Sequence, residues 1–255
     1  MSSRIWTPAA LSSERRALSG ACWRVVEAQH KVSTLKLVDT LAEQALLESL
    51  IEQTKPPVPP ECRRLHYLLA TPFRYGSPYP RGSRFRRAGM TPGICYASAR
   101  VDTAIAETVF SRLLFFAESP ATPWPANAGE FTAFSARFAT RRGLDLMLPP
   151  LAADKAWTHP TDYAPCQALA DAARAAAVEV IRYESVRDPA RGANIAILAC
   201  PAFKSAGPAE RQTWRIQLGA SGARALREFP DARLEFTREV FAADARIAAL
   251  AWDRQ

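Results

Sequence analysis

Patterns that would indicate metal binding or disulfide bonding are missing from this sequence of 255 residues. Its five cysteines are odd in number and never closer than about thirty residues, which argues against a disulfide framework and a cysteine-based zinc site. This usage points to a reducing cytoplasm. The three histidines, His30, His66 and His159, show no ligand spacing either. We therefore expect no metal.

Signatures of several familiar protein classes are also absent. No apolar run approaches the roughly 20 residues of a membrane-spanning helix, and the N-terminal residues lack an apolar core followed by a cleavage site. The expectation is a soluble protein of the cytoplasm. Without a Gly-x-Gly-x-x-Gly or Walker-type loop, an ordinary dinucleotide fold or a nucleotide hydrolase is disfavoured. No Gly-x-Ser-x-Gly occurs, so nothing indicates a nucleophilic triad.

Lysine is scarce whereas arginine is abundant. The chain has 28 arginines against five lysines, and its formal net charge is +8. Because guanidinium groups match carboxylates and phosphates geometrically, this balance is compatible with phosphate-bearing partners. An alanine- and arginine-rich genome would produce the same bias, and composition alone does not choose between the two explanations.

Hydrophobic periodicity predicts a mixture of helices and strands. Residues 1–20 read as an arm, and the proline-rich segment 118–130 reads as a surface loop. Helices are expected at 33–55, capped by Ser33 or Thr34 and stopped by PPVPP, and at 102–116, 163–177 and 238–252. Strands are expected at 21–29, 65–70, 94–98, 131–139, 144–148, 178–185, 194–200, 214–219 and 232–237. Because this order does not alternate strictly, it favours an α+β domain over a doubly wound sheet.

The segment between Phe73 and Phe116 carries the densest cluster of chemically useful residues. It opens with five arginines in fourteen residues: Arg74, Arg81, Arg84, Arg86 and Arg87. Interspersed glycines allow guanidinium groups to converge on an anion. The alternative is a solvated basic loop, whose interleaved aromatic residues would also suit stacking on nucleic-acid bases.

Three residues that follow later in the chain, Tyr96, Glu107 and Ser185, complete a candidate site. Tyr96 lies on the short strand ICYAS, where it is either a packing residue or a flat platform for an aromatic ring. Glu107 shares a helix face with Phe110 and Leu114, and a carboxylate on such a face is costly unless it is paired or used. A structural ion pair with an arginine is the plain alternative. Ser185 ends a strand, where a hydroxyl either forms a turn or addresses a ligand.

The order of these residues resembles the RES-domain family, bacterial toxins named for an Arg, a Glu and a Ser. The matching segments are FRYG…GSRFRRAG, ICYAS, TAIAE and IRYESVRDP…GAN, which together span about residues 65–200. The resemblance implies a single mixed α+β domain with a split, mostly antiparallel sheet like that of ADP-ribosyltransferase toxins, plus an N-terminal helix. We expect residues 1–60 to form an arm and a helix packed on the core, and 61–255 to form the catalytic domain.

The same resemblance implies an activity on NAD⁺. Members of the family cleave its nicotinamide–ribose bond or transfer ADP-ribose to a target protein, and an antitoxin with a helix-turn-helix region blocks them. Carried over by position, the catalytic residues are Glu107, Arg86, Tyr96 and Ser185. The residues expected to bind NAD⁺ are Arg74, Arg86, Arg87, Tyr96 and Ser185.

The arginine assignments stay open at this point. The family's usual GGRWN reads FRRAG here, so Arg86 and Arg87 compete for one role, while Arg24 competes with Arg74 for another. In the implied chemistry, Glu107 stabilises positive charge on the ribose, the arginines hold the pyrophosphate and Tyr96 stacks on nicotinamide. Ser185 would hydrogen-bond the ribose or the carboxamide. A nucleic-acid-binding module built on the Arg74–Arg87 loop is the non-enzyme alternative.

Overall fold

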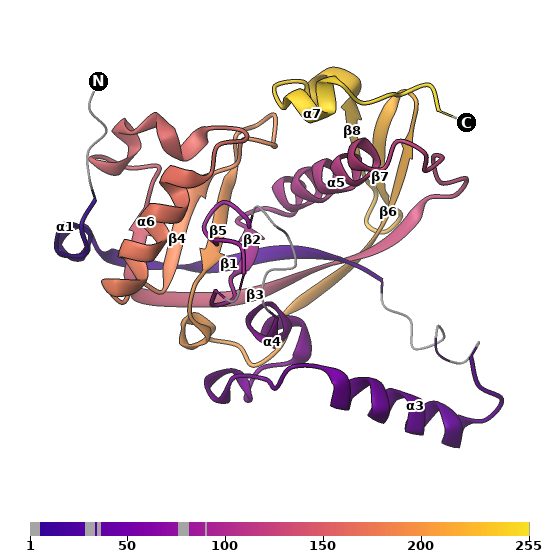
Figure 1. Ribbon diagram of the computed structural model, residues 1–255, viewed down its shortest axis with the longest axis horizontal. Helices are drawn as coiled ribbons and strands as arrows, with labels where there is room; N and C mark the ends of the chain where they lie inside the picture. The colour runs from indigo at the N-terminus through magenta and orange to yellow at the C-terminus, as the bar shows by residue number, and fades with distance from the viewer. Residues whose placement is uncertain (1–5, 29–33, 35–36, 76–81, 90, 255) are drawn as a thin grey trace.

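The chain folds around one eight-stranded sheet (Figure 1). The computed structural model describes residues 6–28, 34, 37–75, 82–89 and 91–254. The strands are β1 (Arg16–Glu27), β2 (Cys95–Ser98), β3 (Gly129–Asp145), β4 (Val180–Glu184), β5 (Ala193–Ile197), β6 (Glu210–Gly219), β7 (Gly222–Arg227) and β8 (Ala232–Thr237). Their order in the sheet is β1-β2-β5-β4-β3-β6-β7-β8. Within the described residues, every strand pairing is antiparallel except that between β3 and β4.

The long strand β3 joins the two parts of this sheet. Its first residues pair with β6, its last residues pair with β4, and β1 runs beside it over most of its length. Because β1 also pairs with β2, the strands β1, β2, β5, β4 and β3 close on themselves. Gly143 permits this closure, since a Cβ there would lie 2.5 Å from the side chain of Leu18.

Helices cover the two parts of the sheet separately. The helices are α1 (Pro8–Ser13), α3 (Leu41–Thr54), α4 (Tyr67–Arg74), α5 (Val101–Glu118), α6 (Ala164–Ala175) and α7 (Ala245–Ala248). Helices α6 and α1 share one core cluster with β4, whereas α5 shares another with β6 and β8. A third cluster lies between the closed strands and α4. The expected mixture of α and β structure is confirmed.

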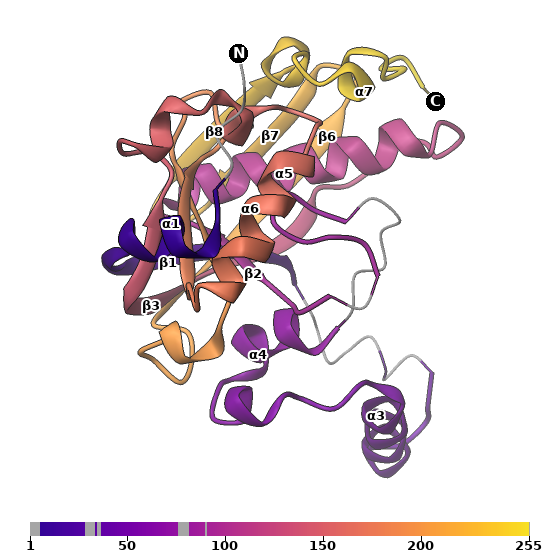
Figure 2. The same cartoon turned by 60° about the vertical axis from the view of Figure 1, so that its left-hand side comes forward.

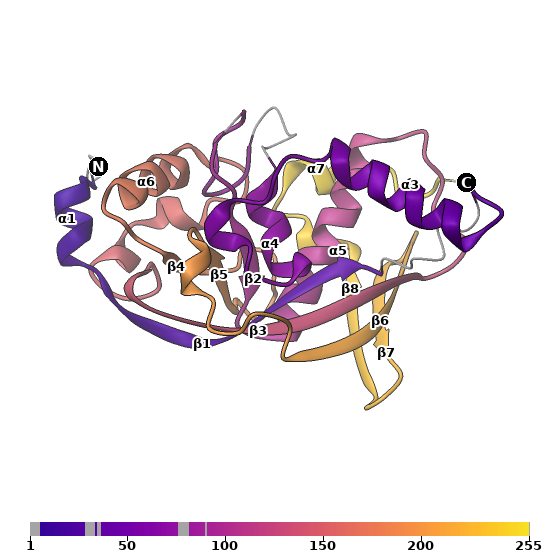
Figure 3. The same ribbon diagram turned by 90° about the horizontal axis from the view of Figure 1, so that it is seen from below.

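Helix α3 contributes no residue to any core cluster. None of its residues is buried, and Figure 2 shows it at the edge of the molecule, away from the sheet. It begins at Leu41 rather than near Ser33, because the side chain of Thr40 and that of Glu43 form a reciprocal capping box. The strand expected at 21–29 appears as β1, which begins earlier, at Arg16 within the expected arm, and runs beside β3 (Figure 3).

Four other elements differ from the sequence expectations. Residues 65–70 start helix α4 instead of a strand, since a short apolar run fits either structure and the ring of His66 caps the helix at the N–H of Leu68. The segments 131–139 and 144–148 belong largely to one strand, β3. Strand β7, which the periodicity did not indicate, follows a tight turn at Gly222 with φ +121°. The expected closing helix is reduced to a 3-10 turn and α7, because Asp244 caps a new helix start.

One disulfide is present, although the cysteine spacing argued against a disulfide framework. Cys62 and Cys200 are bonded, with their Cα atoms 5.6 Å apart. They lie 138 residues apart in the sequence, so spacing alone could not pair them. Cys22, Cys95 and Cys166 are free and buried. Among the described residues, no helix combines the length and apolarity needed to cross a membrane.

Candidate functional site

A cleft of about 1360 Å³ contains three of the six residues that the sequence predicted for catalysis or ligand binding. Small-molecule sites commonly occupy about 300–1,000 Å³, so the cleft can hold a ligand of dinucleotide size. Its walls come mainly from β1, the loop before β2, β2 itself and helix α5, with single residues of β4 and β5 and further residues of α4, α6 and α7. Arg24, Arg86, Tyr96 and Glu107 all line it.

Glu107 is held in the cleft by two short hydrogen bonds. Ser185 Oγ and Asn194 Nδ2 both donate to Glu107 Oε1, each at 2.6 Å. The amide of Asn194 is oriented in turn by Ser98, whose Oγ donates to Asn194 Oδ1 at 2.6 Å. The other carboxylate oxygen, Oε2, has no hydrogen-bond partner in the part of the chain that the structure describes. One oxygen is therefore fixed by the protein and the other is available to a ligand.

Ser185 acts on the site through Glu107 and does not face the cleft. Its side chain is fully buried, and its Oγ accepts the N–H groups of Arg187 at 3.2 Å and Asp188 at 3.0 Å. A hydroxyl has one proton, and here that proton goes to Glu107. The expected hydrogen bond from Ser185 to a ribose or carboxamide therefore has no free donor in this arrangement.

Tyr96 links β2 to the arginine loop. Its phenol oxygen accepts the N–H of Phe85 at 3.0 Å and lies 2.8 Å from Ser83 Oγ. Burial raises the pKa of Tyr96 to about 12, which keeps the phenol neutral at any physiological pH. The hydroxyl is thus occupied by the loop, while the side chain still forms part of the cleft wall.

Arg84 is the most buried arginine of the loop. Its side chain donates to the carbonyl oxygens of Trp157 at 2.8 Å and His159 at 3.0 Å, and its guanidinium lies 4.7 Å from the ring centroid of Tyr163. Arg84 and Tyr163 both line the cleft. All its hydrogen-bond partners are uncharged, and in the described residues no carboxylate pairs with it. Within the described residues, the cation therefore has no counter-ion.

Arg86 and Arg24 also lack a carboxylate partner among the described residues. Arg86 donates to the carbonyl oxygens of Tyr75 at 2.6 Å and Thr91 at 2.7 Å, and burial lowers its pKa. Arg24 donates to the carbonyl oxygen of Tyr96 at 3.3 Å. Neither pairs with a carboxylate anywhere in the described ranges. Three arginines on the cleft wall thus have their charge uncompensated.

Two further arginines of the cluster lie outside the cleft: Arg74, the last residue of α4, and Arg87 of the loop. Arg74 pairs with Glu52 of α3 at 2.6 Å, and Arg87 pairs with Asp171 of α6 at 2.7 Å. Neither lines the cleft. Because a guanidinium that already has a carboxylate partner is a poorer anion ligand, their expected role as ligand-binding residues loses its geometric support. Arg81 lies outside the described residues.

Two residues that line the cleft, Asn194 and Tyr183, were not predicted from the sequence. Asn194 is the second residue of β5, and the apolar character of that strand concealed its role. A buried amide at the start of an otherwise apolar strand was the available signal. Tyr183 is also buried, packs edge-on against Phe85 with ring centroids 4.8 Å apart, and lines the cleft. Burial, with the nearby charge of Glu107, raises its pKa well above the usual value.

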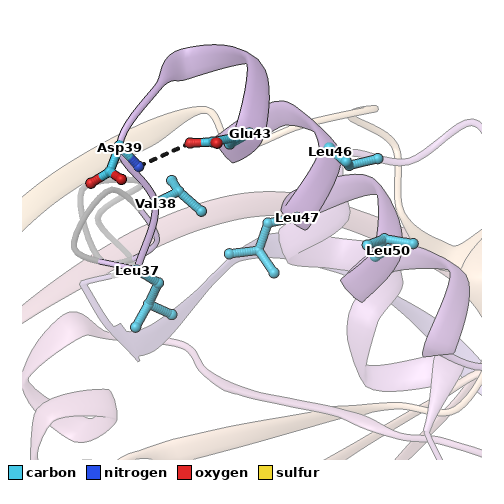
Figure 4. Close-up of a pocket in the computed structure, with 7 residues that line it drawn as sticks. All are labelled: Leu37, Val38, Asp39, Glu43, Leu46, Leu47 and Leu50. Carbon is cyan, nitrogen blue, oxygen red and sulfur yellow. Dashed lines mark hydrogen bonds between the residues drawn. The ribbon is translucent and has the colours of Figure 1, made fainter.

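A second hollow, of about 350 Å³, lies beside α3 (Figure 4). Apolar side chains dominate it, and its carboxylates are Asp39 and Glu43; Glu43 accepts the N–H of Asp39 at 3.0 Å. The described residues that line it include no arginine, lysine or histidine. Across the described residues, no group of three His, Cys, Asp or Glu side chains gathers in a metal-binding arrangement.

Comparison with known proteins supports the resemblance seen in the motifs. The model of the RES domain matches residues 58–219, which confirms the predicted family. No curated protein matches the chain. Among solved structures, a chain of the M. tuberculosis MbcT–MbcA toxin–antitoxin complex is similar with a TM-score of 0.44 and 15% sequence identity. The similarity covers 81% of this chain and 92% of that chain.

Proposed function

The chain belongs to the RES-domain family, and we propose that it is an enzyme that cleaves the nicotinamide–ribose bond of NAD⁺. The observation that carries this proposal is the pairing of two features in one cleft. One is Glu107, with Oε1 fixed by Ser185 and Asn194 and Oε2 available. The other is the set of three cleft-lining arginines without carboxylate partners among the described residues, Arg24, Arg84 and Arg86.

These arginines suit the pyrophosphate of NAD⁺. Each guanidinium is held by uncharged oxygens, so its position is fixed while its charge stays available. Charge-assisted hydrogen bonds to phosphate are about twice as strong as neutral ones. We assign the principal clamp to Arg84 and Arg86, which come from the same loop, with Arg24 on the adjoining β1. The arrangement also weighs against a nucleic-acid-binding loop, because Arg84 is buried and Arg74 and Arg87 are already paired with carboxylates.

Glu107 suits the bond-breaking step. When the C1′–N bond breaks, its electron pair goes to the nicotinamide ring, which leaves as a neutral molecule, and positive charge develops on the ribose. A carboxylate oxygen fixed beside C1′ would stabilise that charge without rearranging in the transition state. An acceptor oxygen, from water or from a protein side chain, then bonds to C1′ and loses its proton to solvent. The ring of Tyr96 is proposed to flank the nicotinamide.

We further propose the biological setting that the family implies. The protein would act as the toxin of a toxin–antitoxin pair, with a fold related to the ADP-ribosyltransferase toxins, and work in the cytoplasm. Its partner would be an antitoxin with a helix-turn-helix region that blocks the cleft, so DNA would be contacted only through that antitoxin. NAD⁺ is the substrate, and no metal takes part. Whether water or a target protein accepts the ADP-ribose is decided by experiment.

The test compares Glu107→Gln with wild-type protein. Release of nicotinamide from NAD⁺ is followed chromatographically, and the variant is expected to be slower by at least about 100-fold, since a neutral amide cannot stabilise the cationic ribose. Glu228→Gln is the matched control, because Glu228 is a surface residue outside the cleft. Unchanged cleavage by Glu107→Gln would overturn the mechanism.

The assay also separates the competing activities. Labelled NAD⁺ incubated with cell extract distinguishes hydrolysis, which leaves free ADP-ribose, from transfer, which labels a protein. If the wild-type protein left NAD⁺ intact but bound DNA or RNA with a steep dependence on salt, the nucleic-acid alternative would be favoured.

A further inference from the structure

The C-terminal segment reaches the wall of the cleft beside Glu107. The family match ends at residue 219, yet Arg246 lines the cleft and Asp244 contacts another cleft residue, Arg187. Arg187 NH2 and Asp244 Oδ2 are 3.1 Å apart, and their side chains are 4% and 0% exposed. An ion pair this deeply buried is costly unless both charges are well coordinated.

Asp244 is coordinated by two arginines and by backbone. Arg246 donates to Oδ1 at 3.0 Å and to Oδ2 at 2.8 Å, and the N–H of Arg246 donates to Oδ1 at 3.0 Å. Burial by itself would raise the pKa of Asp244, but these bonds and the charges of Arg246 and Arg187 hold it below its usual value. Asp244 is therefore a fixed carboxylate onto which the side chain of Arg187 is anchored.

Arg187 in turn touches both elements that position Glu107. Its guanidinium lies 3.7 Å from the ring centroid of Phe110, which is on α5 one turn after Glu107. Its own N–H donates to Ser185 Oγ at 3.2 Å, and Ser185 donates to Glu107. Its side chain also lies 3.3 Å from the hydroxyl of Tyr163, the residue whose ring faces Arg84. Arg187 thus connects Ser185, which supports Glu107, with helix α5 and with Tyr163, which packs against Arg84.

We infer that Asp244 is a positioning residue of the site: by anchoring Arg187, it fixes the turn that carries Ser185 and so the orientation of Glu107. The C-terminal segment is then part of the catalytic unit, although it lies beyond the matched RES segment. The expected effect of Asp244 on turnover rests on the proposed function. Its expected effect on the turn at Ser185 rests on the geometry alone.

NAD⁺ turnover and hydrogen exchange at the Asp188 amide test this inference. In Asp244→Asn, NAD⁺ turnover is expected to fall at least about tenfold with a smaller change in KM, because the carboxylate is misoriented while the substrate-binding arginines remain. Hydrogen exchange at the Asp188 amide, which donates to Ser185 Oγ, is expected to accelerate at least about tenfold as the turn loosens. Asp244→Glu, which keeps the charge, should recover part of both.

Two further variants separate positioning from stability. Leu250→Ala weakens the packing of the C-terminal segment at a buried residue, and it should lower Tm while leaving turnover and the Asp188 amide unchanged. The double variant Arg187→Met with Asp244→Leu replaces the buried pair with apolar side chains, which commonly restores stability. We expect its Tm to recover and its turnover to stay low. Recovery of both, or an Asp244→Asn protein with wild-type turnover and exchange, would overturn the inference.

The outcomes distinguish this inference from the proposed function. If the wild-type protein does not cleave NAD⁺, the proposed function fails, and the exchange of the Asp188 amide still decides whether Asp244 fixes the turn. If the wild-type protein cleaves NAD⁺ and Asp244→Asn changes neither readout, only the positioning role fails.

Discussion

Ser185 and Glu107 lie 78 residues apart in the sequence and 2.6 Å apart in the fold, and the serine must be the donor. Two backbone N–H groups already point at Ser185 Oγ, so its single proton is directed to the carboxylate. Glu107 Oε1 is therefore held by a protein hydrogen bond, and Oε2 is available to a ligand in the cleft. Ser185 is therefore tied to the reaction by geometry without touching the ligand.

Replacing Ser185 with alanine should lower the rate of NAD⁺ cleavage more than it weakens NAD⁺ binding. Loss of the hydroxyl frees Glu107 to rotate and leaves two buried N–H groups without their acceptor, which should also lower stability by about 1–3 kcal/mol. We expect kcat to fall by about 10- to 100-fold, with KM changing much less. Steady-state kinetics of nicotinamide release measure this. Ser111→Ala, at an exposed serine on the cleft rim, is the control; an equal loss there would refute a specific role.

The arginines provide a second prediction, because the structure divides them by their partners. Arg84→Lys should raise KM for NAD⁺ by about tenfold or more, since a lysine cannot reproduce the two bonds to Trp157 and His159 and also face a phosphate. Arg87→Lys should change KM less than about twofold, because Arg87 pairs with Asp171 outside the cleft. The reverse ranking, measured in the same assay, would move the clamp to Arg87.

The sequence predicts the helices and strands that carry the site far better than it predicts which groups the side chains contact. The helix at 102–116 is long and periodic, and it appears as α5; the strand holding Tyr96 is bounded by a turn and a glycine, and it appears as β2. Spacing therefore places Tyr96 and Glu107 correctly on a strand and the following helix. Local patterns suffice for such elements because the hydrophobic face is repeated along them.

The arginine loop shows why the rest could not be predicted. No periodicity operates in a loop, so whether an arginine faces the cleft depends on what it meets elsewhere. Arg87 meets Asp171, 84 residues away, and Arg74, at the end of α4 just before the loop, meets Glu52 of a helix outside the family match. The same reason hid Asn194 and Asp244, whose roles exist only once distant strands and the C-terminal segment are packed together. Tertiary pairing, and not local propensity, decides these contacts.

The buried phenol of Tyr96 predicts a loss of stability at alkaline pH. Its pKa is about 12 in the folded protein against about 10 in an exposed tyrosine. A pKa raised on folding contributes stability that is complete below the unfolded value of about 10 and is lost as the pH rises towards 12. The free energy of unfolding, measured by urea titration between pH 8 and 11.5, should therefore fall above pH 10.

Tyr96→Phe tests that assignment. The variant should be less stable than the wild type at pH 8, because the N–H of Phe85 loses its acceptor, but its stability should fall less steeply above pH 10. Tyr183 and the buried thiols of Cys22, Cys95 and Cys166, whose pKa values burial also raises, contribute the remaining slope. Tyr67→Phe, at an exposed tyrosine, is the control and should follow the wild type. Identical slopes for wild type and Tyr96→Phe would refute the contribution of Tyr96.

The bond between Cys62 and Cys200 predicts that stability depends on the redox state. It joins the turn before α4 to the turn after β5, and a cross-link closing so long a loop commonly contributes about 2–4 kcal/mol. Reduction should therefore lower Tm by several degrees, and Cys62→Ala with Cys200→Ala should show the low Tm in both states. Burial raises the pKa of Cys22 and of Cys95, so neither thiol should contribute a redox effect of its own. Calorimetry with and without a reductant measures the difference; an unchanged Tm on complete reduction, verified by thiol counting, would show that the bond adds no stability.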